Sequence, residues 1–183
     1  MIIIGKKLEN RKIAMIIAFR GFRDEEYFIS KEILSKAGAK ISTVSNLPGK
    51  AIGKEGGEAD VDILLEKFNP VEFDAVIFIG GPGALKHLDG QISYDIAKET
   101  VLKEKILAAI CISPVILAKS GVLKNKTATV WTGTFDKSAL RFFKENGVIY
   151  RGDGVVMDEK IITARDSEAV QQFAEAVIAV LTS

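Results

Sequence analysis

The sequence predicts an α/β protein built on one doubly wound, mostly parallel sheet with helices on both faces. Short apolar runs, such as 13–19, 73–79 and 106–110, alternate with longer amphipathic stretches, which is the pattern of stacked βαβ units. A run that is apolar at every position suits a strand buried on both faces. The 183 residues suffice for one domain but not for two of ordinary size. We therefore expect residues 1–183 to form a single domain.

The remaining elements follow from local signals along the chain. A helix is predicted at 24–36, because acidic residues fill its first turn and Gly38 follows its end. The stretch 47–57 is rich in Gly and Lys and predicts a surface hairpin or loop. Ser167, followed by an acid, indicates a cap region for a final amphipathic helix. We expect helices at 60–68, 93–104, 114–119, 137–145 and 167–181, and strands at 39–45, 127–131, 148–150, 155–157 and 161–163.

Composition excludes several classes of function. Lysine and arginine total 25 and the acids 24, so there is no strong electrostatic case for a nucleic-acid or membrane partner. The longest apolar stretch, 106–118, is shorter than the roughly 20 residues of a membrane span. One cysteine allows no internal disulfide, which with the missing signal peptide favours the cytoplasm. We expect no cofactor and no metal.

The most informative stretch surrounds the only cysteine. An apolar strand at 106–110 leads directly into Cys111, and Pro114 stands where the next helix begins, with Ser113 as a possible N-cap. This is the pattern of a nucleophile elbow. The adjacent helix start favours a thiolate and predicts a lowered pKa for Cys111. The alternative is an inert, buried cysteine acting as a small hydrophobe, and the turn alone leaves both interpretations open.

A family resemblance gives this turn a context. Ala-Ile-Cys at a strand end, a proline shortly after, Gly80-Gly81 at the end of the preceding strand and a carboxylate in the first helix together resemble the ThiJ/PfpI superfamily. The segments 22–26 and 155–165 add to the likeness, which extends from about Arg11 to Leu181. The resemblance implies a flavodoxin-like three-layer fold, a reactive elbow cysteine, a small-molecule substrate and homodimers or larger homo-oligomers.

The resemblance also implies a glutamate from the first helix that hydrogen-bonds the cysteine. By position this residue is Glu26. A buried carboxyl group can stay protonated and donate a hydrogen bond to a thiolate. The alternative is a solvated first-turn acid, a description that fits Glu25 better. Because two adjacent helical residues cannot both face one pocket, only one of them can be the partner.

An oxyanion hole is the next feature that the resemblance implies. One donor would be the backbone N–H after the cysteine, which belongs to Ile112, and the other would come from the Gly-Gly turn. Pro82 has no N–H, so Gly81 or Gly83 would have to supply the second donor. The alternative is a glycine-rich turn without a catalytic part. A phosphate-binding loop is disfavoured, because the full spacing and the following lysine are missing.

The sequence departs from the peptidase members of the superfamily at one position. Those members place a histidine directly after the cysteine, where this chain has Ile112, so the usual Cys-His pair is missing. The sole histidine, His87, could lie near the site or be exposed on a short helix. Its position also argues against class I glutamine amidotransferases, which need a later histidine. Other possible pocket residues are Ser113 and Trp131, and three arginines near strand ends could bind an anion or be solvated: Arg20, Arg23 and Arg165.

Three functions remain open at this stage. The first is a glyoxalase III-like or deglycase-like enzyme in which Cys111 and Glu26 act on small reactive carbonyl compounds. The second is an intracellular cysteine peptidase or amidase, which needs a base that the elbow does not supply. The third is a non-enzymatic redox sensor in which Cys111 is oxidised to a sulfinic acid.

Overall fold

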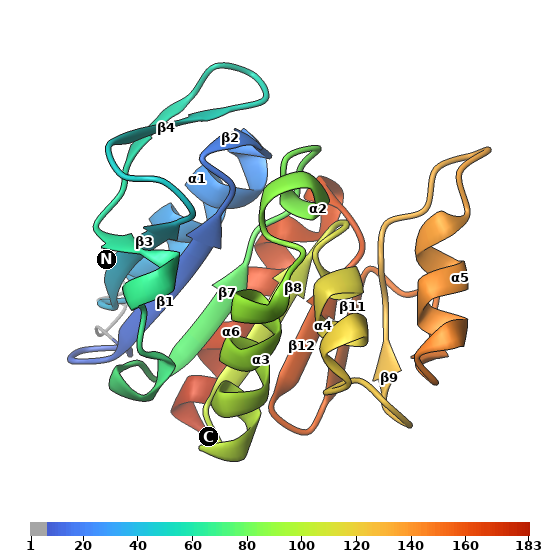
Figure 1. Cartoon of the computed structure of the whole chain (residues 1–183). Helices are drawn as coiled ribbons and strands as arrows, with labels where there is room; N and C mark the ends of the chain where they lie inside the picture. The colour runs from blue at the N-terminus through green and yellow to red at the C-terminus, as the bar shows by residue number, and fades with distance from the viewer. Residues whose placement is uncertain (1–6) are drawn as a thin grey trace.

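A central sheet with helices on both faces organises residues 7–183, which the computed structural model describes (Figure 1). Its seven strands lie in the order β11-β12-β8-β7-β1-β3-β6. Every neighbouring pair is parallel except the edge pair of β11 and β12. The predicted α/β class, with its flavodoxin-like three-layer arrangement, is confirmed.

The elements of the large sheet and its helices have the following bounds. The strands are β1 (Lys12–Ile17), β3 (Lys40–Ser45), β6 (Ile63–Leu64), β7 (Ala75–Phe78), β8 (Ile106–Ile110), β11 (Val155–Asp158) and β12 (Ile161–Ala164). The helices are α1 (Asp24–Lys36), α2 (Ala84–His87), α3 (Gln91–Leu102), α4 (Pro114–Ser120), α5 (Ser138–Glu145) and α6 (Val170–Thr182), with 3₁₀ turns at Leu65–Lys67, Pro70–Glu72 and Ser167–Ala169.

Two small sheets lie outside the main one. The first joins β2 (Arg20–Phe22), β4 (Lys50–Gly53) and β5 (Glu58–Asp60), and the second joins β9 (Thr127–Ala128) and β10 (Ile149–Tyr150). Strands β4 and β5 pair antiparallel, so the predicted surface hairpin is present.

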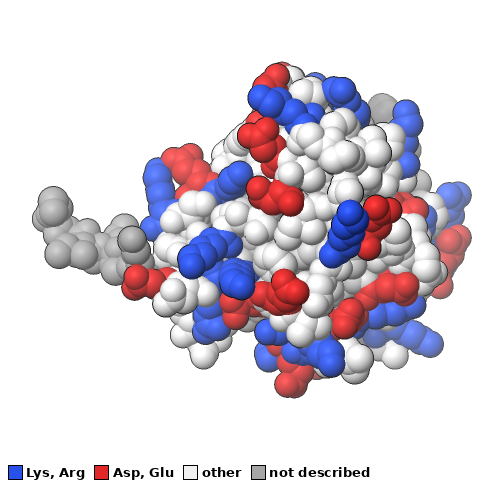
Figure 2. Space-filling view, turned by 60° about the vertical axis from the view of Figure 1, so that its left-hand side comes forward, with Lys and Arg blue, Asp and Glu red and all other residues white. Residues whose placement is uncertain are grey.

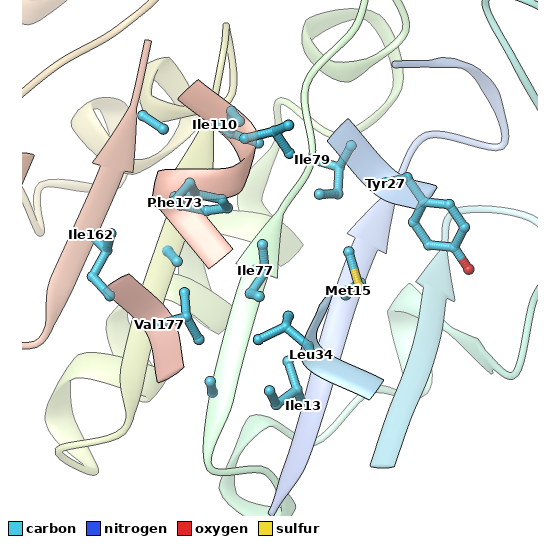
Figure 3. Packing of buried hydrophobic residues seen from close by; sticks show 14 of the residues in the cluster. Ile13, Met15, Tyr27, Leu34, Ile77, Ile79, Ile110, Ile162, Phe173 and Val177 are labelled. Atoms are coloured by element: carbon cyan, nitrogen blue, oxygen red, sulfur yellow. The ribbon is translucent and has the colours of Figure 1, made fainter. Parts of the chain in front are cut away.

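The apolar runs are explained by the two faces of the sheet. Successive strand residues point to opposite faces, so Ile13 and Met15 of β1 pack against α1 and α6, whereas Ile16 faces the layer of α3 and α4. Figure 3 shows the first of these cores, in which Leu34 and Phe173 lie over the central strands. A strand covered on both sides is therefore mostly apolar, and the buried polar residues of the sheet, such as Ser45 and Thr163, form hydrogen bonds.

Two predicted elements are wrong. The stretch 60–68 was expected to be a helix, but it holds the end of β5, then β6 and a 3₁₀ turn. The sheet edge determines this, because Asp62 exchanges hydrogen bonds with the backbone of Thr43 in β3. The strand expected at 127–131 ends at Ala128, and beyond it the Trp131 N–H donates to the carbonyl of Cys111.

The surface carries both signs of charge. On the face drawn in Figure 2, basic and acidic side chains are interspersed, as a formal net charge of +1 leads one to expect. Within residues 7–183, no helix is long and apolar enough to cross a lipid bilayer.

Two phenylalanines with opposite degrees of burial provide a test of the packing of the core. Phe173 is fully buried between α6 and the sheet, whereas Phe135 is 98% exposed. We expect Phe173→Ala to lower the free energy of unfolding by about 3–5 kcal/mol and Phe135→Ala to change it by less than about 0.5 kcal/mol. Urea denaturation followed by circular dichroism measures both, and equal losses would contradict the assigned packing.

Candidate active site

The site lies where the sheet changes its winding direction. From β1 the chain adds β3 on one side and later β7 on the other, and ligands of open α/β sheets bind at such a switch point, beyond the carboxyl ends of the strands. Gly80 lies just beyond the end of β7, and Cys111 directly follows β8. These two neighbouring strand ends form the base of the site.

The backbone of Cys111 has the left-handed conformation of an elbow. Its φ is 65°, which is uncommon for a residue other than glycine and costs about 1–3 kcal/mol. Hydrogen bonds hold it from both sides: the Cys111 N–H donates to the carbonyl of Ala164 at 2.9 Å, and the Trp131 N–H donates to the Cys111 carbonyl at 2.8 Å. The sharp strand-to-helix turn predicted from the sequence is therefore present.

Glu26, rather than Glu25, points into the protein. Its side chain is fully buried, while that of Glu25 is exposed. One carboxylate oxygen accepts a hydrogen bond from the Gly80 N–H at 2.9 Å, and the other accepts one from the Ser167 hydroxyl at 3.3 Å. The carboxyl group of Glu26 and the thiol of Cys111 also influence each other, and each changes the pKa of the other. The alternative of a solvated first-turn acid is excluded for Glu26.

Gly80 is the spacer between the two groups. A Cβ at this position would lie 2.5 Å from the Cβ of Cys111 and 2.8 Å from Oε2 of Glu26. Both distances are below van der Waals contact, so any side chain would push the cysteine and the carboxyl group apart. Glycine is therefore required here because a side chain does not fit. Its φ is not positive, so the backbone conformation is not the reason.

Burial dominates the ionisation of both groups. It raises the pKa of Glu26 from 4.5 to about 7, although the Gly80 N–H, the thiol and the charge of Arg23 all favour the carboxylate. Burial, followed by the charge of Glu26, raises the pKa of Cys111 to about 12, and the Gly81 N–H opposes the shift. The sequence predicted a lowered pKa for the thiol; this was wrong, because desolvation and a neighbouring carboxylate outweigh the helix start.

The cysteine and the glutamate therefore act as one ionising unit. Two groups this strongly coupled lose their protons in two steps that belong to the pair. Between pH of about 7 and about 12 the pair carries a single negative charge. In that range the charge lies on the Glu26 carboxylate and the proton on the sulfur of Cys111, so the carboxylate is placed to accept the thiol proton.

The candidate oxyanion donors differ in their availability. The Gly81 N–H hydrogen-bonds the cysteine side chain, whereas the Gly83 N–H donates to the carbonyl of Gly21 at 2.9 Å and is already partnered. Gly83 is therefore dropped as a candidate. Within residues 7–183, the Ile112 N–H has no protein acceptor. Ile112 and Gly81 remain as the two donors.

Two other sequence candidates lie elsewhere. Ser113 is fully buried and donates its hydroxyl hydrogen bond to the carbonyl of Ile79 at 2.7 Å, so it neither caps α4 nor lines the pocket. His87 is exposed and borders a separate hollow with Asn46 and Asp89. The cap predicted at Ser167 is also displaced, because Asp166 accepts the capping hydrogen bond and Ser167 turns toward Glu26.

Two cavities meet at Cys111. Arg23, Cys111 and Trp131 line both of them. The first cavity, of about 300 Å³, continues over Lys54 and apolar side chains, and the second, of about 220 Å³, continues over acidic ones. Trp131, for which the sequence left pocket lining and core packing open, lines both cavities and also packs against the core. Arg20 and Arg165 border neither cavity; Arg165 pairs with Asp166 instead.

Sequence reasoning missed several of the lining residues. Asp166, Ser167 and Glu168 follow the carboxyl end of β12, a position where site residues are expected, so a signal for them existed. Lys54 comes from the β4–β5 turn, which nothing in the sequence connects to the cysteine. Leu85 lies in the short helix α2, which was considered from the sequence for His87 but was not connected to the cysteine.

Fold and site together define a class of protein: a doubly wound α/β protein with an elbow cysteine and a buried glutamate at the switch point. Comparison with known proteins names the family. The model of the DJ-1/PfpI family matches residues 11–180, and the chain belongs to this family. The ThiJ/PfpI resemblance seen in the sequence is confirmed.

Relatives agree with this assignment. An uncharacterized protein of Methanocaldococcus jannaschii is 34% identical over 169 residues, which cover 92% of this chain and 81% of that protein. A Pyrococcus furiosus protein named deglycase PfpI is 30% identical over 122 residues, or 67% of this chain and 74% of that one. The crystal structure of a ThiJ/PfpI domain protein from Brachyspira murdochii superposes with a TM-score of 0.88 at 32% identity, covering 94% and 97% of the two chains.

The strain at the elbow predicts an unusual order of stability. Glycine adopts a positive φ without the steric cost that alanine meets. We expect Cys111→Gly to be about 1 kcal/mol more stable than Cys111→Ala, the reverse of the usual order. Thermal unfolding of the two variants gives the difference. A glycine variant less stable than the alanine variant would argue against the left-handed turn.

The raised pKa of Glu26 predicts a pH-dependent stability. The unfolded carboxyl group loses its proton near pH 4.5 but the folded one near pH 7, so the folded state binds more protons between these values and its stability falls as pH rises. At about 1.4 kcal/mol per pKa unit, wild type should lose about 3 kcal/mol relative to Glu26→Gln between pH 4 and pH 8. Urea denaturation across this range measures the difference, and a constant gap would contradict the buried, titrating carboxyl group.

Proposed function

We propose that this protein is a cysteine-dependent enzyme that acts on small reactive carbonyl compounds, converting a 2-oxoaldehyde into a 2-hydroxy acid. The observation that carries the proposal is the buried pair of Cys111 and Glu26, in which an acid with a pKa of about 7 acts on a protonated thiol. A general base works best when its pKa lies near the operating pH, and that of Glu26 is about 7.

The first step is addition of sulfur to the aldehyde. The Glu26 carboxylate takes the thiol proton while Cys111 attacks the carbonyl carbon, so an S–C bond forms and the C=O π bond opens. The same proton then passes to the alkoxide oxygen, which gives a hemithioacetal. The free Ile112 N–H and the Gly81 N–H are the groups that would stabilise the developing oxyanion.

The second step is an internal redox reaction without an external oxidant. Glu26 removes the proton from the former aldehyde carbon and returns it to the neighbouring carbon through an enediol, while the hydroxyl proton of the hemithioacetal passes to the ketone oxygen. The first carbon thereby reaches the oxidation level of a thioester, and the second is reduced to an alcohol. Water then cleaves the S–C bond, which releases the 2-hydroxy acid and restores the thiol.

The family context supports an enzyme of this kind. Several relatives at about 30% identity are named deglycases, among them the proteins from Pyrococcus furiosus, Pyrococcus abyssi and Pyrococcus horikoshii. A sole cysteine that must stay reduced fits the cytoplasm, and the resemblance implies a homodimer or larger homo-oligomer. We retain both as part of the proposal.

The two other functions considered from the sequence have less support. A cysteine peptidase needs a base beside the cysteine, and His87 borders a different hollow. A redox sensor reacts through a thiolate, and burial with a raised pKa keeps Cys111 protonated at neutral pH. We therefore expect slow oxidation of Cys111 by mild peroxide, which mass spectrometry would detect at its single site.

Adjacent glutamates provide a matched test of the mechanism. With methylglyoxal as substrate and lactate as the measured product, Cys111→Ser should abolish turnover, and Glu26→Gln should lower kcat at least about 100-fold. Glu25→Gln, which alters an exposed side chain, should stay within about twofold of wild type. In the wild type, kcat/KM should rise as pH passes through about 7, when the pair loses its first proton.

Two outcomes would overturn the proposal. The first is clean, folded wild-type protein that forms no lactate. The second is turnover that survives Cys111→Ser, which would assign the reaction to another group or to a contaminant.

A further inference from the structure

We infer that the first cavity selects carbonyl compounds that carry a small anionic group, a carboxylate or a phosphate, and that Arg23 and Lys54 bind this group. The inference rests on the proposed function, because it names the substrate class of the same site. It is drawn from the distribution of charge around Cys111.

The two cavities beside the sulfur have opposite character. In the described part of the chain, the first cavity has two cationic side chains in its lining and no acid, and its other walls include Leu85 and Trp131. The acids lie in the second cavity, where Asp166 and Glu168 accompany Glu26 and outnumber Arg23, which lines both cavities. An anionic group would be attracted to the first cavity and repelled from the second. This asymmetry gives the substrate one orientation across the cysteine.

Arg23 has unused hydrogen-bonding capacity. Its Nε is buried and has no hydrogen-bond partner among residues 7–183, and no carboxylate in that range lies within ion-pair distance of it. The backbone of Arg23 is fixed, because its N–H donates to the carbonyl of Gly80 at 2.9 Å. A buried N–H without a partner is costly, and the guanidinium fork matches a carboxylate or phosphate. A bound anion would provide the missing acceptor.

Lys54 is held in place by a rigid turn. The carboxylate of Asp24 accepts hydrogen bonds from the N–H groups of Glu55 at 2.8 Å and Gly57 at 2.7 Å. The Lys54 N–H itself donates to the carbonyl of Phe22 at 2.8 Å. Gly57 leaves no room for a side chain, since its Cβ would lie 2.4 Å from Asp24. The turn is thus fastened to the start of α1, beside Arg23.

The ammonium group of Lys54 is available to a ligand. Its ion pair is with the neighbouring Glu55 at 3.5 Å, and both side chains are about half exposed. Such surface pairs contribute little, so a ligand can compete for the charge. The apolar walls around the cavity strengthen an interaction with an anion relative to open water. The cavity, of about 300 Å³, suits a molecule of a few heavy atoms.

Two alkylating reagents test this inference without relying on turnover. Iodoacetate and iodoacetamide have nearly the same shape but differ in charge, and both alkylate Cys111, forming the S–C bond as iodide leaves and the thiol proton is lost. The measured quantity is the rate constant for iodoacetate divided by that for iodoacetamide. Dividing this ratio by the same ratio for the urea-unfolded chain isolates the effect of the folded pocket. The single cysteine makes the modified site unambiguous.

We expect the normalised ratio to exceed about 5 in the wild type and to fall about fivefold in Lys54→Met. Arg23→Gln should lower it further. Lys54→Met keeps the test decisive if the arginine variant fails to fold. The matched control is Lys50→Met, which removes an exposed lysine of the same hairpin that lies outside the cavity, and it should leave the ratio unchanged.

The source of the anionic group is identified by protection. Acetate or inorganic phosphate should slow alkylation by iodoacetamide in the wild type but not in Lys54→Met. Stronger protection by acetate would identify a carboxylate site, and stronger protection by phosphate a phosphate site. A normalised ratio near 1, or one that Lys54→Met does not change, would overturn the anion site. A high ratio without turnover of methylglyoxal would overturn the proposed function and leave the anion site standing.

Discussion

The hydrogen bond between the buried carboxyl group of Glu26 and the N–H of Gly80 is the contact on which the site depends. It fixes the first helix to the end of β7 and places a carboxyl oxygen beside the sulfur of Cys111. Burial of the carboxyl group raises its pKa to about 7, although the hydrogen bond from Gly80 acts in the opposite direction. The same burial that makes the acid costly to ionise makes it useful as a proton carrier, and the protein fold supplies the compensating packing.

The turn at Cys111 adds a second constraint. Two backbone hydrogen bonds, one from β12 and one from the loop after β9, hold the left-handed conformation. The residues involved, Ala164 and Trp131, are far from the cysteine in sequence. The direction of the sulfur therefore depends on contacts with β12 and with the loop after β9, and not on the turn alone.

The fold could be predicted from the sequence to a large extent, because wholly apolar runs indicate strands buried on both faces and α1 begins and ends at the predicted residues. Cys111 follows from its position between a strand and a proline, and Glu26 from the family resemblance. Contacts between distant segments could not be predicted: Ser167 and Lys54 reach the site through tertiary packing. The direction of the thiol pKa also depends on tertiary burial, which no local pattern records.

Arg23, Asp24 and Glu26 all lie at the start of α1. One short segment therefore contains an anion-binding residue, the residue that holds the hairpin and the acid beside the cysteine. Neighbouring helical positions differ by about 100° in direction. Inserting a single residue at this point would therefore change the positions of Arg23, Asp24 and Glu26 relative to one another and to the site. The β4–β5 hairpin contributes Lys54 to the pocket but no group to the pair of Cys111 and Glu26. Evolution could therefore retune what this pocket accepts through β4 and β5 while leaving its acid–base chemistry intact.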